Sequence, residues 1–176
     1  MAVDILLYLL LGVLIVALIF AGPMLKSRLS RGASRAGDAA GRKFAASQLV
    51  ETLGEFGTTV VIHAPEPVAR EIAAAAIAKK QKEYVIRSDG GYGIRFLEPD
   101  DTIVRLVTDP EGTRMQVQTF REYMGVPQTA PLWKELRSRV ASAAGARDVS
   151  VTEGPPAEYL RGELIDDRNA RWERDV

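Results

Sequence analysis

The stretch YVIRSDGGYGIRFLEPDDTIVRLVTDPEGTRMQVQTFREY, residues 84–123, alternates apolar and polar side chains in four short runs. A period of two is typical of half-buried β-strands. The segments between the runs are rich in turn residues, and DPEG places Pro and Gly as a type I turn requires. The stretch therefore predicts a meander of four antiparallel strands, over 84–87, 92–97, 102–108 and 113–122.

Helical patterns flank this meander on both sides. A short strand over 58–63 is followed by an Ala-rich helix over 68–80, in which apolar residues recur at helical spacing. After the meander, residues 129–144 predict a second helix with Thr129 at its N-cap, and 147–152 a last short strand. Antiparallel strands with segregated helices predict a small two-layer α+β domain, with the helices on one face of the sheet.

The order of these elements over residues 57–145 resembles a reduced helix-grip (START-like) fold, in which a curved sheet wraps a C-terminal helix. That resemblance implies a second function, the binding of a lipid or other hydrophobic ligand between the sheet and helix 129–144. Tyr92, Ile94 and Phe96 lie on one face of a predicted strand, where they would line such a cavity or pack as a core. Packing as a core is the preferred interpretation.

The N-terminal run ILLYLLLGVLIVALIFAG, residues 5–22, carries no charge. About 20 residues of helix span roughly 30 Å, the thickness of the hydrocarbon core of a bilayer. A helix buried in the domain would be shorter and less uniformly apolar. A cleaved signal peptide would begin with a basic segment, whereas only Asp4 is charged before the run. The sequence therefore predicts an uncleaved single transmembrane helix.

A basic segment follows this run and raises three alternatives: a nucleic-acid patch, a flexible linker, or a topology signal. The chain has 23 basic and 23 acidic residues, whereas nucleic-acid-binding domains are usually basic throughout. Cations beside a span stay on the cytoplasmic side and attract anionic lipid headgroups. We therefore expect the N-terminus outside and the domain in the cytoplasm. The residues expected at the membrane surface are Lys26, Arg28, Arg31, Arg35, Arg42 and Lys43.

Composition then divides the chain into four segments, and the last is a charged tail that follows Pro155-Pro156. The expected divisions are an anchor over 1–25, a basic juxtamembrane linker with a short amphipathic helix over 26–56, the α+β domain over 57–152 and the tail over 153–176.

The residues give little support for catalysis. There is no Cys, which excludes disulfides, thiolate metal sites and a Cys nucleophile. His63 is the single histidine and does not make a zinc site alone. The glycines of DGGYG lie between two predicted strands, whereas a phosphate-binding loop joins a strand to a helix. We expect no enzyme activity, no metal and no cofactor.

The tail carries the candidate contacts with a partner. Tyr159, Leu160, Leu164 and Ile165 are predicted to form a short helical face that docks on the domain or on a partner. Trp172 is an aromatic residue within the charged stretch DDRNARWERDV. Aromatic residues dominate many interfaces. The alternative is a disordered tail with an exposed Trp.

These features favour a non-catalytic accessory subunit of a membrane protein complex. The bias toward Arg, Ala, Gly and Val, with one span and a small domain, resembles small accessory proteins of actinobacterial respiratory supercomplexes. That resemblance implies integral membrane proteins of a respiratory complex as partners.

Overall fold

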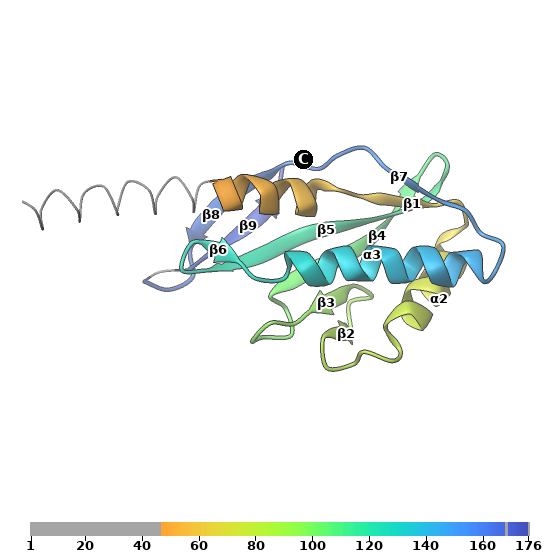
Figure 1. Cartoon of the computed structure of the whole chain (residues 1–176), viewed down its shortest axis with the longest axis horizontal. Coiled ribbons are helices and arrows are strands. Elements are labelled where there is room, and N and C mark those ends of the chain that lie inside the picture. Colours follow the sequence, from red (N-terminus) through yellow and green to blue (C-terminus); the bar gives the residue numbers. More distant parts are fainter. Residues whose placement is uncertain (1–46, 168, 176) are drawn as a thin grey trace, which may run out of the picture. The chain divides into compact units, whose positions relative to one another are not determined.

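The computed structural model describes residues 47–167 and 169–175, all within a compact unit that covers Ala45–Val176 (Figure 1). Residues 47–57 are helical. The elements that follow are β1 Val60–Ile62, α2 Glu66–Ile77, β2 Tyr84–Ile86, β3 Tyr92–Ile94, β4 Thr102–Asp109, β5 Gly112–Tyr123, β6 Val126–Pro127, α3 Ala130–Gly145, β7 Val151–Glu153, β8 Tyr159–Leu164 and β9 Ala170–Arg174.

The sheet is built around β5, its longest strand. The order β2-β3-β4-β5 confirms the predicted meander, and all its pairings are antiparallel. Along the other edge of β5, β1 pairs with residues 113–115 and β9 pairs with residues 119–121. β7 extends the sheet beyond β1, and β8 extends it beyond β9. The chain thus forms the predicted α+β domain with an antiparallel sheet.

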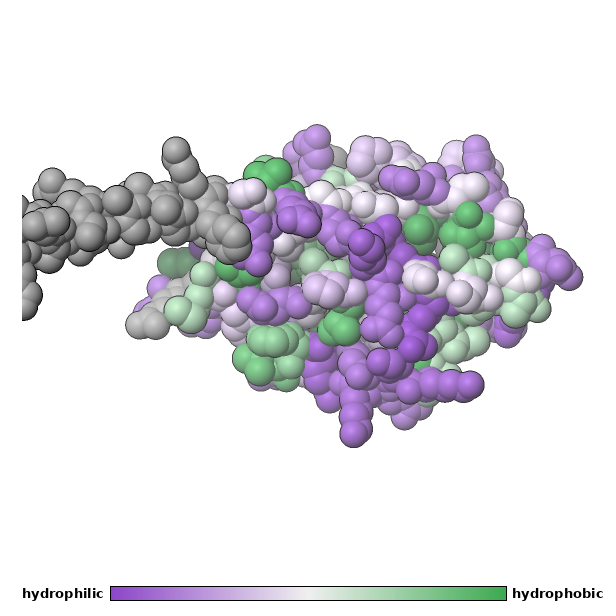
Figure 2. Space-filling view, viewed as in Figure 1, coloured by the Kyte–Doolittle hydropathy of each residue, from purple (hydrophilic) through white to green (hydrophobic). Residues whose placement is uncertain are grey.

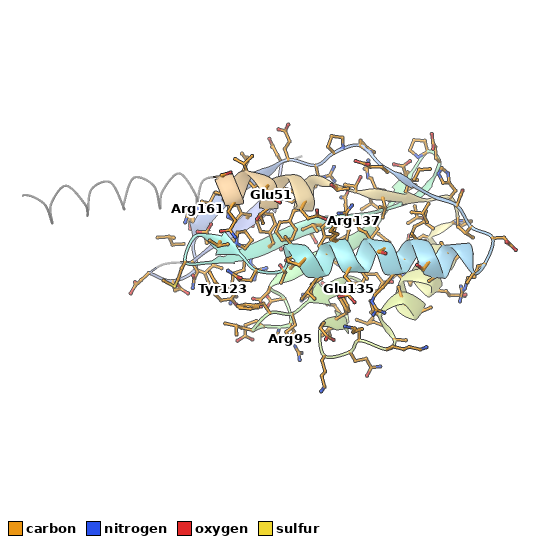
Figure 3. The ribbon with its side chains drawn as sticks, viewed as in Figure 1. Glu51, Arg95, Tyr123, Glu135, Arg137 and Arg161 are labelled. Carbon is orange, nitrogen blue, oxygen red and sulfur yellow. The ribbon has the colours of Figure 1, made fainter. Side chains whose placement is uncertain are left out.

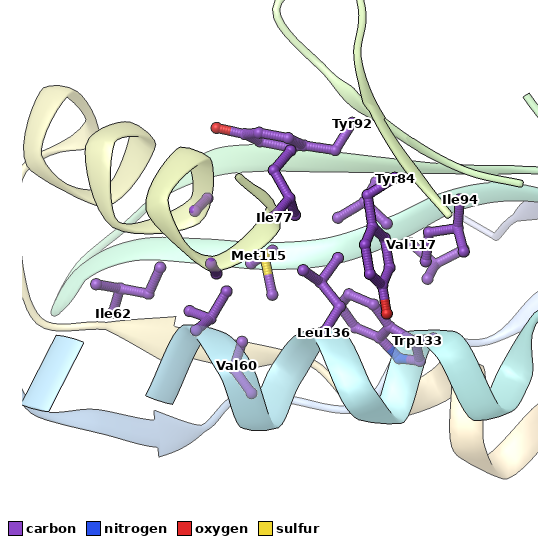
Figure 4. Packing of buried hydrophobic residues seen from close by; sticks show 14 of the residues in the cluster. Val60, Ile62, Ile77, Tyr84, Tyr92, Ile94, Met115, Val117, Trp133 and Leu136 are labelled. Atoms are coloured by element: carbon purple, nitrogen blue, oxygen red, sulfur yellow. The ribbon is translucent and has the colours of Figure 1, made fainter. Parts of the chain in front are cut away.

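The helices cover the face of the sheet that carries Met115, Val117 and Phe120, all fully buried. Figure 4 shows Trp133 and Leu136 of α3 beside Val117 in this core. Helix 47–57 packs beside α3, where the Trp133 indole N–H is shared between the backbone oxygens of Glu55 and Thr58, at 3.1 and 3.2 Å. The core therefore fills the space between the sheet and α3.

The first residue of α3 follows Thr129, at the expected N-cap position. The Thr129 hydroxyl, however, makes no hydrogen bond to the helix and instead pairs with the hydroxyl of Thr102. Both residues are buried, so the hydroxyls satisfy each other where water is excluded. The cap residue therefore ties the helix to β4.

The segment expected to be a charged tail contributes β8 and β9 to the same sheet. The expected helical face over residues 159–165 is wrong, because 159–164 form a strand. Tyr159, Arg161 and Leu164 pair with β9 through a register shift, and Ala170 and Trp172 alternate toward the core. The side chains of this part of the chain alternate between the two faces of the sheet, as in a β-strand, and do not follow helical spacing.

The expected transmembrane helix over 1–25 and the basic residues 26–43 lie outside the described residues. Within the described ranges, no helix is both long and apolar enough to cross a membrane.

Candidate interaction surface at one end of the sheet

Several segments that are distant in sequence meet where β5 ends. β6 pairs with the last residues of β5, and Gln48 of helix 47–57 lines the same hollow as Val126 and Pro127 of β6. Figure 3 shows Glu51, Tyr123 and Arg161 at this end of the domain. The end therefore combines the start of the described chain with its last strands.

Glu122 of β5 is a buried carboxylate, 1 % exposed, at the centre of this end. The Trp172 indole N–H donates to its Oε2 at 2.7 Å, and the Arg161 guanidinium donates to its Oε1, with Nε at 3.0 Å. Burial acts to raise the pKa of Glu122, but the hydrogen bonds from Arg161 and Trp172 outweigh it and lower the pKa. The charged carboxylate therefore joins β5, β8 and β9.

Asp101 is the second buried carboxylate and holds the loop between β3 and β4. The backbone N–H groups of Phe96, Leu97 and Glu98 donate to its Oδ2 at 3.0, 2.7 and 2.8 Å, and the Tyr123 hydroxyl donates to its Oδ1. Burial opposes ionisation, yet these bonds together lower the pKa of Asp101. The loop is thus fixed against the end of β5.

Exposed apolar side chains surround these anchored carboxylates. We call them the apolar rim: Phe96, Leu97, Met124, Leu164 and Ile165, which are between 46 % and 75 % exposed. The Phe96 ring lies 5.5 Å from that of Tyr123, and the next residue, Met124, donates its backbone N–H to Asn169. Asn169 in turn accepts from the backbone of Ile165. Figure 2 shows green side chains at the left end of the visible face.

Around the rim, several cations are paired with carboxylates, whereas other carboxylates are exposed to solvent. Three cations are held by carboxylates: Arg161 by Glu122, Arg171 by Asp100 and Arg121 by Asp101. Three other carboxylates lie exposed beside the rim, on Glu98, Glu163 and Asp167, whereas Asp166 accepts hydrogen bonds from Asn169. The described part of this end is therefore apolar and acidic.

The residues predicted as partner contacts have different environments. The Tyr159 hydroxyl is shared between the backbone oxygens of Val117 and Phe56, at 2.9 and 3.1 Å, and burial raises its pKa. Trp172 is 7 % exposed and stacks on Phe120, so it belongs to the core of this domain. Leu160, Leu164 and Ile165 are exposed, and the last two belong to the rim.

Sequence reasoning missed Glu122, Asp101, Leu97 and Met124. It placed Phe96 with Tyr92 and Ile94 in the core, but Phe96 is 49 % exposed and only the other two are buried. The signal for Phe96 and Leu97 was available, because two apolar residues come directly before the turn EPDD. For Glu122 the signal was its place in the alternation of β5, on the face of Phe120.

The other polar groups of the domain give no evidence of a metal centre. The His63 ring lies 2.9 Å from the Thr152 hydroxyl, on the neighbouring strand. In the described part of the chain, no group of three or more His, Asp or Glu side chains is placed to hold a metal ion. His63 therefore serves as a link between β1 and β7.

Comparison with known proteins gives no match. No protein-family model, no curated protein and no solved structure matches this chain.

Proposed function

We propose that this chain is a non-catalytic accessory subunit of a membrane protein complex, anchored by a single transmembrane helix. The uncharged run over 5–22 and the basic residues after it support the anchor. One observation carries the docking role: the apolar rim lies at the end of the domain where the described helix 47–57 begins. Exposed apolar side chains that gather in one place mark interaction sites.

The proposal includes a topology and a kind of complex. The N-terminus lies outside, the domain lies in the cytoplasm, and the basic residues 26–43 contact anionic headgroups of the inner leaflet. The resemblance to actinobacterial accessory proteins favours a respiratory complex. The described buried carboxylates support a structural role, because Glu122 and Asp101 are occupied in holding strands and a loop.

The anchor is tested with the full chain carrying a C-terminal tag. It should remain in membranes through an alkaline carbonate wash, and the tag should be protected from protease added to intact spheroplasts. Replacing Leu10 and Val13 with Arg should release the chain, because central arginines cost about 2.5–3.5 kcal/mol each on insertion scales. The matched control Leu160→Arg, on exposed β8, should leave the chain in membranes. Release of the unsubstituted chain by carbonate would contradict the anchor.

The docking role is tested in mild detergent. The chain should migrate with polytopic membrane proteins, and replacing both Met124 and Leu164 with Ser should release it. Ile86→Ser is the matched control, because Ile86 is also exposed, at 60 %, but lies on β2 away from the rim. A chain that migrates as a clean monomer with no co-purifying membrane protein argues against this role.

A second candidate function, the binding of a hydrophobic ligand, has one supporting feature. The space between the sheet and α3 is occupied by Trp133, Leu136 and Val140, each at most 1 % exposed. A groove of about 470 Å³, however, lies between α2 and β2, with Ile77 and Ile86 in its lining. Ala74→Trp should fill this groove and abolish uptake of a fluorescent fatty acid by the full chain. Uptake that is unchanged in this variant excludes the groove as the site.

A further inference from the structure

We propose that the apolar rim binds a basic cytoplasmic loop of an integral membrane protein, and not the lipid surface. This inference rests on the proposed function, because it assumes that the anchor holds the domain beside the cytoplasmic side of a membrane. It adds the chemistry of the partner: a loop that presents Lys or Arg together with apolar side chains. The other occupants considered are the bilayer itself and a second copy of this chain.

The rim itself is suited to a specific partner. Its five side chains come from three separate parts of the chain: the loop after β3, the turn after β5, and the end of β8 with the residue that follows it. Asp101 fixes the first of these parts through three backbone N–H groups, and the bond from the Met124 backbone to Asn169 joins the other two. A prearranged apolar surface loses little conformational entropy when it binds.

The charge beside the rim selects among the occupants. The cations Arg161, Arg171 and Arg121 are already paired, whereas the carboxylates of Glu98 and Glu163 lie exposed. The turn sequence ELIDDRN, residues 163–169, has three acids and one base. An acidic and apolar surface therefore requires a basic and apolar partner.

The charge of the partner separates the three possible occupants. Only a protein loop would carry a positive charge opposite to that of the rim. Cytoplasmic loops of integral membrane proteins carry an excess of Lys and Arg near their spans. The inner leaflet is negative, and its field acts within about a Debye length, roughly 10 Å, of the surface. Exposed carboxylates at the rim would thus be repelled by the lipid and attracted by the loop. A second copy of the same acidic surface is disfavoured for the same reason.

The test uses the full chain in nanodiscs of zwitterionic lipid. The chain has no Cys, so Gln128→Cys, at an exposed position just after β6, provides one labelling site beside the rim for an environment-sensitive dye and leaves every rim side chain in place. Glu111→Cys provides the control label at the β4–β5 hairpin, at the opposite end of β5. The probes are soluble peptides that mimic a loop: alternating Arg and Leu, the same peptide with Ser for Leu, and the same peptide with Glu for Arg.

The Arg-Leu peptide should change the emission of the Gln128 label saturably and leave the Glu111 label unchanged. Its affinity should fall about tenfold from low to high salt, and by a similar factor when Glu98 and Glu163 become Gln and Asp167 becomes Asn. The matched control is replacement by Gln of Glu71, Glu111 and Glu153, three exposed carboxylates elsewhere on the domain. The Arg-Ser and Glu-Leu peptides should bind weakly.

Four outcomes overturn the inference. The first is equal binding of all three peptides, and the second is the absence of any saturable response. The third is a change of the Gln128 label in nanodiscs of anionic lipid without peptide, which identifies the bilayer as the occupant. The fourth is a response that depends only on the concentration of this chain, which identifies a second copy. The carbonate wash is independent of all four, so the anchor stands or fails separately.

Discussion

Glu122 is the residue on which the C-terminal strands depend. It lies on β5, yet the groups that satisfy its carboxylate, Arg161 and Trp172, come from β8 and β9. A buried carboxylate without donors loses its hydration with no compensation. The same charge that would be costly alone therefore favours the packing of the last strands against β5.

At this residue, Glu122→Gln should lower the free energy of unfolding by about 1–3 kcal/mol near neutral pH, because hydrogen bonds to a charged group are stronger than those to an amide. Urea unfolding of the full chain in detergent, followed by Trp fluorescence, measures the change. Glu111→Gln is the control, because Glu111 is exposed at the β4–β5 hairpin. A loss equal to that of the control would show that the charge contributes nothing.

The difference in unfolding free energy between the native chain and Glu122→Gln should depend on pH. The pKa of Glu122 is lower in the folded chain than the usual value of about 4.3 in an unfolded chain. Its stabilising effect is thus complete above that value and is lost as pH falls through the folded pKa. The difference in stability between the native chain and Glu122→Gln should be constant near neutral pH and shrink below about pH 4. A difference that grows in acid contradicts this assignment.

Among the elements, helix 47–57 connects the start of the described chain to the last strands. Its final residue, Gly57, accepts a hydrogen bond from the Ala157 backbone N–H at 2.9 Å. A Cβ at Gly57 would lie 2.7 Å from the Ala157 oxygen, whereas a Cβ at Gly54 would meet nothing within 4 Å. The close approach of two backbones therefore requires glycine at only one of the two positions.

Two substitutions in this helix should have opposite effects. Gly54→Ala should stabilise the chain by about 0.5–1 kcal/mol, because Ala has the higher helix propensity and no clash arises. Gly57→Ala should destabilise it, because the carbonyl at Ala157 must move. Urea midpoints of both variants measure the pair, each serving as the control for the other. Stabilisation by both substitutions would show that residues 57 and 157 are not in contact in solution.

The elements also show what the sequence could predict. The meander over 84–123 was predictable, because alternation and turn residues agree at every step. β8 and β9 were missed, since five of the six residues of β8 are exposed and an exposed strand has no apolar stripe. Ala170 and Trp172 do alternate, but two residues are a short signal. Phe96 and Leu97 carried a signal, but the assembly of the whole rim could not be predicted, because it depends on which loops the sheet brings together.

For the molecule as a whole, helix 47–57 and the last strands of the described chain meet at Phe120, three residues before the end of β5. Its ring stacks on Phe56 from helix 47–57 at 4.1 Å and on Trp172 from β9 at 5.8 Å, with Tyr159 edge-on at 5.0 Å. This cluster lies beneath the end that carries the rim. The domain is therefore expected to unfold as a unit and not to release its C-terminal strands separately.

Truncation after residue 152 tests this unity. It removes Tyr159, Ala170 and Trp172, uncovers Phe120 and leaves Glu122 without its donors. Loss of a buried Trp alone costs about 3–5 kcal/mol, a large part of the 5–15 kcal/mol that stabilises a typical domain. In membranes, the truncated chain should therefore be degraded at protease concentrations that leave the full chain intact. Leu160→Ser, a change on the exposed side of β8, should behave as the full chain does. Equal protease resistance of the truncated and full chains would show that residues 57–152 form the domain alone.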